Sequence, residues 1–180
     1  MIGTKPDRPS SPNAPPASRV VYPTVHLAHL AAASVLAGTE ASLLADAGAE
    51  SGLLDGLRVA AANRPERLQL FDPANPAALH LALSQHGPYE ALVVIDAVNW
   101  PRTDRLWDGV LTACRRHRPV LLAALPPADA ELLAGLRRAT DLWACVMPSP
   151  EGCGVVTGCG ELLVQLAVHP RTRHLMGVIR

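Results

Sequence analysis

The sequence predicts an α/β fold in which a largely parallel sheet lies between two layers of helices. From Arg19 onward, short apolar runs alternate with helix-length amphipathic segments, a pattern typical of βαβ units. One of these runs, residues 91–98, is rich in Val and Ile and has no polar residue before Asp96, as expected for a strand that is covered on both faces. We therefore expect a three-layer αβα sandwich with five or six strands.

Further strands are expected at residues 67–72, 119–125 and 141–147, the first of them near an edge because its polar and apolar residues alternate. Another strand is expected at residues 33–38, although Ala is a poor strand former. Amphipathic patterns predict helices between the strands, at residues 51–62, 76–85, 103–116, 127–138 and 161–168. Four glycines between residues 151 and 160 predict a loop.

The length and composition of the chain predict one domain behind a tail. At 180 residues, of which 49% are hydrophobic, the chain can bury one sizeable core. Residues 1–18 are mainly Pro, Ser, Asn and Ala and cannot bury enough apolar surface to offset chain entropy. We expect residues 1–18 to be a disordered tail and residues 19–180 to form a single α/β domain.

The charge and hydropathy of the chain exclude several classes of partner. Sixteen basic side chains balance sixteen acidic ones, so no net field attracts nucleic acid or an anionic membrane. The longest apolar run, residues 27–38, is shorter than the roughly 20 residues that span a bilayer. The first 18 residues contain no apolar core of a signal peptide, so we expect a cytoplasmic protein with four reduced cysteines.

Candidate functional residues stand where strands are predicted to end. Asp72 and Asp96 each close a strand, and sites in parallel sheets form outside the carboxyl ends of the strands. A carboxylate in that position can bind a metal ion or act as a base. The structural alternative is that it caps the following turn.

Three segments suggest a family. They are residues 37–48 (AGTEASLLADAG), residues 70–82, and residues 89–98 (YEALVVIDAV). In order and spacing they resemble the amino-terminal half of the hydrogenase maturation endopeptidases, which trim the large subunit of nickel-iron hydrogenase after nickel insertion. Residues 132–148 are similar to the late helix and final strand of that family. The resemblance implies a phosphorylase/hydrolase-like sheet.

The resemblance also implies a site. In that family, two acidic residues and a His bind the nickel of the client, which is reasonable because nickel accepts carboxylate and imidazole ligands. Asp96 matches one acidic ligand, and Asp46 matches the acid beside the other, whose own position holds Ala47. Residues 124–129 contain no His. These differences predict a member that has lost the activity or rebuilt its site with other residues, such as Glu50, His80 or His86.

We therefore expect a hydrogenase maturation peptidase-like protein, catalytically impaired, whose partner is a hydrogenase large subunit or a similar protein client. If the protein retains activity, it is a nickel-recognising endopeptidase in which Asp96 acts with the assistance of Asp46, and both side chains bind metal. No tightly bound cofactor is expected, and the only metal would be the nickel of the client.

The alternative is a receiver-like domain that is not phosphorylated and acts as a protein-interaction or regulatory module. Asp96 at a strand end, followed by Pro101, resembles a phosphoacceptor strand. The acidic pair, the hydroxyl residue and the Lys that receivers also need are missing. This alternative predicts five strands in the order 2-1-3-4-5.

A third alternative is a zinc cluster of Cys153, Cys159, His169 and His174. The spacing of the two cysteines does not fit structural zinc sites, although that of the His pair does.

Overall fold

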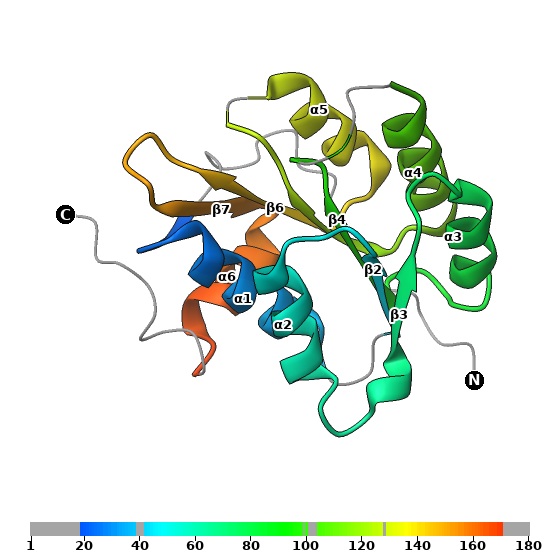
Figure 1. Cartoon of the computed structure of the whole chain (residues 1–180), viewed down its shortest axis with the longest axis horizontal. Coiled ribbons are helices and arrows are strands. Elements are labelled where there is room, and N and C mark those ends of the chain that lie inside the picture. Colours follow the sequence, from blue (N-terminus) through cyan, green and yellow to red (C-terminus); the bar gives the residue numbers. More distant parts are fainter. Residues whose placement is uncertain (1–18, 39–41, 99, 101–103, 128, 171–180) are drawn as a thin grey trace, which may run out of the picture.

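The described part of the computed structural model forms one seven-stranded sheet (Figure 1). The structure describes residues 19–38, 42–98, 100, 104–127 and 129–170, so the predicted tail 1–18 lies outside it. The strands are β1 (Arg19–Tyr22), β2 (Ser42–Asp46), β3 (Leu68–Phe71), β4 (Ala91–Asp96), β5 (Val120–Ala124), β6 (Trp143–Pro148) and β7 (Gly154–Gly158).

The strand order across the sheet is β1-β7-β6-β5-β4-β2-β3. Strands β2 to β6 are parallel, whereas β7 runs antiparallel to both β6 and β1. The expected three-layer, largely parallel architecture is confirmed, but the expected number of five or six strands is wrong. The order also rules out the receiver alternative, which required five strands in another order.

The helices lie on both faces of the sheet (Figure 1). They are α1 (Val25–Leu36), α2 (Ser51–Ala60), α3 (Pro76–Leu83), α4 (Asp104–His117), α5 (Ala130–Ala139) and α6 (Gly160–Val168). One layer, formed by α1, α2 and α6, packs on the hydrophobic cluster that contains Leu43 and Leu92. The other layer, formed by α3, α4 and α5, packs on the cluster that contains Val93 and Ile95.

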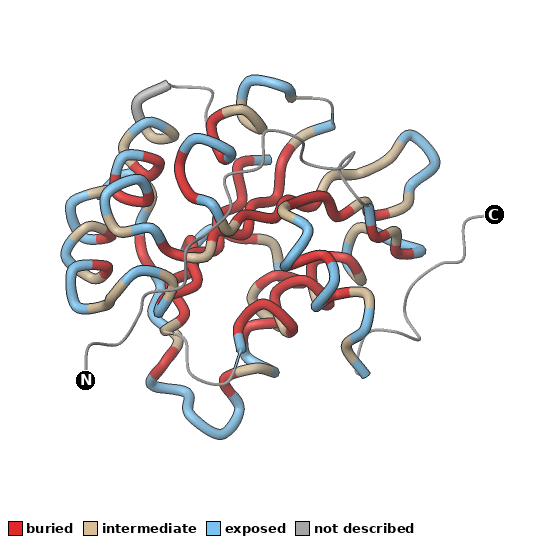
Figure 2. Tube along the Cα trace, turned by 180° about the vertical axis from the view of Figure 1, so that it is seen from behind, coloured by how far each residue is buried: buried red, intermediate tan, exposed pale blue. Residues whose placement is uncertain are grey.

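The centre of the sheet is fully buried, as the uninterrupted run of apolar residues in β4 predicts (Figure 2). Alternate residues of this strand enter the two hydrophobic clusters, because successive side chains of a strand point to opposite faces. Strand β3, predicted to lie near an edge, is the edge strand next to β2.

Two predicted elements are wrong, and both errors come from residues with small side chains. The segment 33–38 is not a strand: residues 25–36 form α1, whose buried alanines pack against the sheet and α2. The glycine-rich loop expected at 151–160 contains β7. A Cβ on Gly158 would lie 2.6 Å from the Trp143 carbonyl oxygen, so glycine permits the close approach of two strands there.

Helices α1 and α2 are unusually close. A Cβ on Gly56 of α2 would lie 2.7 Å from the Leu30 carbonyl oxygen and 2.8 Å from Ala33 Cβ. The amino-terminal turns also lie side by side, since a Cβ on Gly52 of α2 would lie 3.0 Å from the His26 carbonyl oxygen of α1. None of the described helices is long and apolar enough to cross a membrane.

Candidate functional site

The two predicted aspartates meet at the edge of the sheet where the parallel strands end, which we call the carboxyl edge. Asp46 ends β2 and Asp96 ends β4, and these two strands are paired neighbours. The backbone N–H of Asp96 lies 3.4 Å from Asp46 Oδ2. Both residues are 1% exposed. The structure thus brings together the two residues that the sequence analysis selected.

The carboxylate of Asp46 accepts hydrogen bonds from the loop after β2 and from the loop after β4. Its Oδ1 accepts the Gly48 N–H at 2.8 Å, and its Oδ2 accepts the indole N–H of Trp100 at 2.6 Å. Trp100 also contacts Trp107 of α4 edge to face, with the ring centroids 6.0 Å apart. Asp46 therefore links the end of β2 to the loop that follows β4.

The carboxylate of Asp96 is held in a similar way. Its Oδ1 accepts the Val98 N–H at 3.1 Å, and its Oδ2 accepts the Glu50 N–H at 3.0 Å. Backbone donors thus occupy both oxygens of a side chain that is almost inaccessible. This is the structural role that the sequence analysis weighed for a carboxylate at a strand end. The catalytic role proposed for Asp96 and Asp46 stays a prediction.

The side chain of Glu50 is hydrogen-bonded to residues of both α1 and α2. Its Oε2 accepts the Gly52 N–H at 2.8 Å and caps α2, while its two oxygens lie 3.2 Å from His26 Nδ1 and 2.9 Å from His29 Nδ1. Burial opposes ionisation, but the hydrogen bonds from His29, His26 and Gly52 lower the pKa of Glu50 to about 2. Because an ionised carboxylate only accepts hydrogen bonds, both imidazoles donate Nδ1–H to Glu50.

The histidines of this cluster were not selected from the sequence. His26 and His29 lie three residues apart on α1 and reach Glu50 only because α1 and α2 are in close contact. Glu50 itself was named as a possible replacement ligand. The other two residues named with it lie elsewhere, His80 on α3 and His86 in the turn that follows α3.

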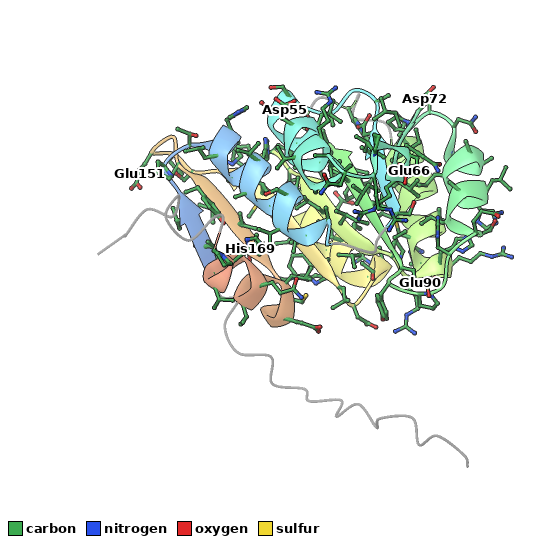
Figure 3. The ribbon with its side chains drawn as sticks, turned by 90° about the horizontal axis from the view of Figure 1, so that it is seen from below. Asp55, Glu66, Asp72, Glu90, Glu151 and His169 are labelled. Atoms are coloured by element: carbon green, nitrogen blue, oxygen red, sulfur yellow. The ribbon has the colours of Figure 1, made fainter. Side chains whose placement is uncertain are left out.

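Other carboxylates occupy solvent-exposed positions. Asp72 follows β3, as predicted, and its Oδ1 accepts the Ala74 N–H at 2.9 Å, so it stabilises the turn. Figure 3 shows Asp72 and Glu90, which precedes β4, on opposite sides of the molecule, in agreement with the parallel direction of the strands.

The described residues contain no group of three or more His, Cys, Asp or Glu side chains that could hold a metal ion. Within this part of the chain, Asp96 and Asp46 therefore have no third His, Cys, Asp or Glu side chain that would complete the expected metal site. Of the zinc cluster considered above, His174 lies outside the described residues, while Cys153 and Cys159 are half-buried free thiols.

Comparison with solved structures identifies the fold. Serine palmitoyltransferase from Sphingomonas wittichii is 17% identical over 90% of this chain and 42% of its own, with a TM-score of 0.68. Serine palmitoyltransferase with a pyridoxal 5′-phosphate (PLP) internal aldimine is 18% identical over 86% of this chain and 41% of its own, with a TM-score of 0.67.

An aromatic amino acid aminotransferase from Burkholderia cenocepacia is 10% identical over 85% of this chain and 47% of its own, with a TM-score of 0.58. No protein-family model and no curated protein sequence matches the chain. The described domain therefore has the fold of PLP-dependent transferases. The chain spans less than half the length of these enzymes.

This finding corrects the family expected from the sequence. The neighbours are PLP-dependent enzymes, not hydrogenase maturation endopeptidases, so the expected peptidase function and the nickel of a client are wrong. The phosphorylase/hydrolase-like sheet was expected from the same resemblance. That expectation is also corrected, because the structural neighbours belong to a different α/β family. The segments that suggested the resemblance are short strand–turn patterns that α/β folds share, which is why their order and spacing misled.

Proposed function

We propose that this chain is a binding domain with the PLP-transferase fold that does not perform Schiff-base chemistry. The observation that supports this proposal is the position of lysine. The chain has a single lysine, Lys5, within the first 18 residues, and the described residues contain none. PLP enzymes hold their cofactor as a Schiff base on a lysine amine.

The second group that PLP sites use is an acidic or basic partner of the pyridinium nitrogen. Asp96 is of the right residue type and lies at the carboxyl edge, where ligands of α/β folds bind. However, backbone N–H groups already occupy both of its oxygens, and it is 1% exposed.

The charge around Asp96 also disfavours this cofactor. Asp46 and Glu50 are both hydrogen-bonded near it, so a phosphate brought to this cluster would face carboxylates of the same sign. The residues present therefore do not fit PLP, and we derive no reaction step from it.

A binding role fits the rest of the site. Asp46, Asp96 and Glu50 together fix the loops after β2 and β4 and the start of α2, which gives the carboxyl edge a rigid shape without a free nucleophile among these residues. The partner class that we propose is another protein, since the balanced charge of the chain offers no attraction to nucleic acid.

The test is to incubate the full chain with PLP, reduce with borohydride and map the modified peptides by mass spectrometry. We expect adducts only on Lys5 or the terminal amine, and loss of the Lys5 adduct in Lys5→Arg. The variant Arg58→Lys, which places an exposed lysine on α2 far along the helix from Glu50, is the positive control for trapping.

Binding itself is measured in parallel by dialysis of the unreduced mixture followed by assay of retained PLP. We expect no stoichiometric retention. One equivalent of retained PLP that is lost in Asp96→Asn would contradict the proposal, because it would show a cofactor site that works without lysine.

A further inference from the structure

We propose that His80 and His117 form a binding site for a divalent transition-metal ion at the junction of α3 and α4. His80 lies in the last turn of α3 and His117 is the last residue of α4. The site lies on the face of the sheet opposite to α1 and α2, so it is separate from the carboxyl-edge cluster and independent of the function proposed above.

The two imidazoles point a nitrogen at each other. His80 Nδ1 and His117 Nε2 are 2.9 Å apart, and the ring centroids are separated by 4.6 Å. At this distance the N–H of one ring donates a hydrogen bond to the lone pair of the other ring, so the two nitrogens face a common point. No other described pair of His nitrogens is hydrogen-bonded in this way.

The separation is close to what a metal ion needs. Two nitrogen ligands bound at 2.0–2.1 Å to a tetrahedral ion lie roughly 3.4 Å apart. An opening of about half an ångström, which side-chain rotation can supply, converts the hydrogen-bonded pair into two ligands. The shared proton then moves to the other nitrogen of its own ring, so binding changes the tautomer and not the net charge of the pair.

The charge beside the pair limits how tightly it can bind a cation. A neutral imidazole offers a lone pair to a metal ion, and protonation removes that lone pair. The positive charge of Arg116, next to His117 on α4, repels a bound cation, which predicts moderate affinity.

Open space for water ligands lies beside His80. A groove of about 400 Å³ runs between the helices, and its lining includes His80 of α3 and Asp108, Thr112 and Arg116 of α4, but not His117. The described residues provide two nitrogen ligands, and water in this groove would complete the coordination. Imidazole ligands suit Cu²⁺, Ni²⁺ and Zn²⁺, whereas Mg²⁺ and Ca²⁺ prefer oxygen.

The consequence of binding would be a link between two helices. An ion that binds the folded protein and not the unfolded chain raises the unfolding temperature as its concentration increases. We expect Ni²⁺ and Zn²⁺ to raise the melting temperature in a concentration-dependent manner and Mg²⁺ to have no effect.

The experiment is a titration of the full chain with Ni²⁺ by calorimetry, with thermal unfolding as a second measurement. Cys153→Ser and Cys159→Ser are introduced throughout to remove the two half-buried thiols, which could also bind the ion. We expect His80→Ala and His117→Ala each to weaken binding at least tenfold. The matched control, His86→Ala, removes a nearby His outside the pair and should bind like the parent.

Loss of one His can also disturb the helix contact, so His80→Gln provides a second variant with a polar side chain of similar length. Circular dichroism checks that each variant is folded. Binding of Ni²⁺ by folded His80→Gln or His117→Ala with the parent affinity would overturn the proposal, as would the absence of binding by the parent. Weaker binding in His86→Ala and parent-like binding in His80→Ala would assign the ion to another site.

Discussion

The carbonyl oxygen of Arg118 accepts the backbone N–H of Tyr89 at 2.9 Å, and both residues adopt the left-handed backbone conformation, with φ of 53° and 67°. They precede β5 and β4, respectively, at the edge of the sheet opposite to Asp96. The Arg118 guanidinium also stacks on the Tyr89 ring and pairs with Asp141. A backbone hydrogen bond thus connects two residues that both have positive φ.

Substitutions at Arg118 separate backbone strain from side-chain contacts. Arg118→Ala and Arg118→Gly both remove the exposed ion pair, but only glycine adopts positive φ without steric cost. We expect Arg118→Gly to be more stable than Arg118→Ala by about 1 kcal/mol in urea unfolding. Equal stabilities would show that the backbone at this position is not strained.

The hydrogen bond from Trp100 to the buried Asp46 predicts a cost for its removal. Trp100→Phe keeps an aromatic ring but leaves the carboxylate without this donor, which typically costs about 1–3 kcal/mol. The control is Trp107→Phe, which changes the other ring of the pair and removes no indole hydrogen bond shown by the structure. A smaller loss for Trp100→Phe than for Trp107→Phe in denaturant unfolding would contradict this role.

The contact between α1 and α2 predicts that Gly56 does not tolerate a side chain. Gly56→Ala places a methyl group against the backbone of α1, and overpacking of this kind costs about 1–3 kcal/mol, offset in part by the roughly 1 kcal/mol gain in helix propensity. Gly160→Ala on α6, where no atom lies within 4 Å of the new Cβ, should be neutral or stabilising. The melting temperatures of the two variants, compared with that of the parent, test this prediction. A melting temperature of Gly56→Ala equal to that of Gly160→Ala would contradict it.

The pKa of Glu50 predicts how stability depends on pH. Its value is lowered from 4.5 to about 2, so the folded state favours the ionised form. The resulting stability is fully present above pH 4.5 and is lost as the pH falls through about 2. Glu50→Gln should be less stable than the parent at neutral pH, and the difference should shrink in acid. A difference that is independent of pH would show that the carboxylate charge does not matter.

The cysteines should divide into two classes. Burial raises the pKa of Cys114 to about 12, and burial also raises the pKa of Cys145 to about 12 despite the opposing charge of Arg137. The thiolate is the reactive form, so these two cysteines should resist iodoacetamide in the folded protein. Cys153 and Cys159 are half-buried and should react first, as followed by mass spectrometry. Rapid modification of Cys114 would indicate that α4 opens readily.

The sequence by itself determined the α/β class, the central strands β4, β5 and β6, and the helices α2 to α5. These elements have long apolar runs or clear amphipathic patterns, and local pattern alone predicts them. It also placed Asp72 and Asp96 at the carboxyl edge, because the ends of parallel strands share one edge of the sheet, whereas Asp46 was selected only through the family resemblance.

The tertiary structure decided the edges of the sheet, the cluster around Glu50 and the family to which the fold is similar. Both α1 and β7 contain small residues because other backbone segments approach them closely. In the sequence, the alanines of α1 indicate a poor strand and the glycines around β7 indicate a loop. His29 lies 21 residues from Glu50 and meets it only through the packing of α1 on α2. Strand order depends on contacts between distant segments, and no local pattern in the chain records them.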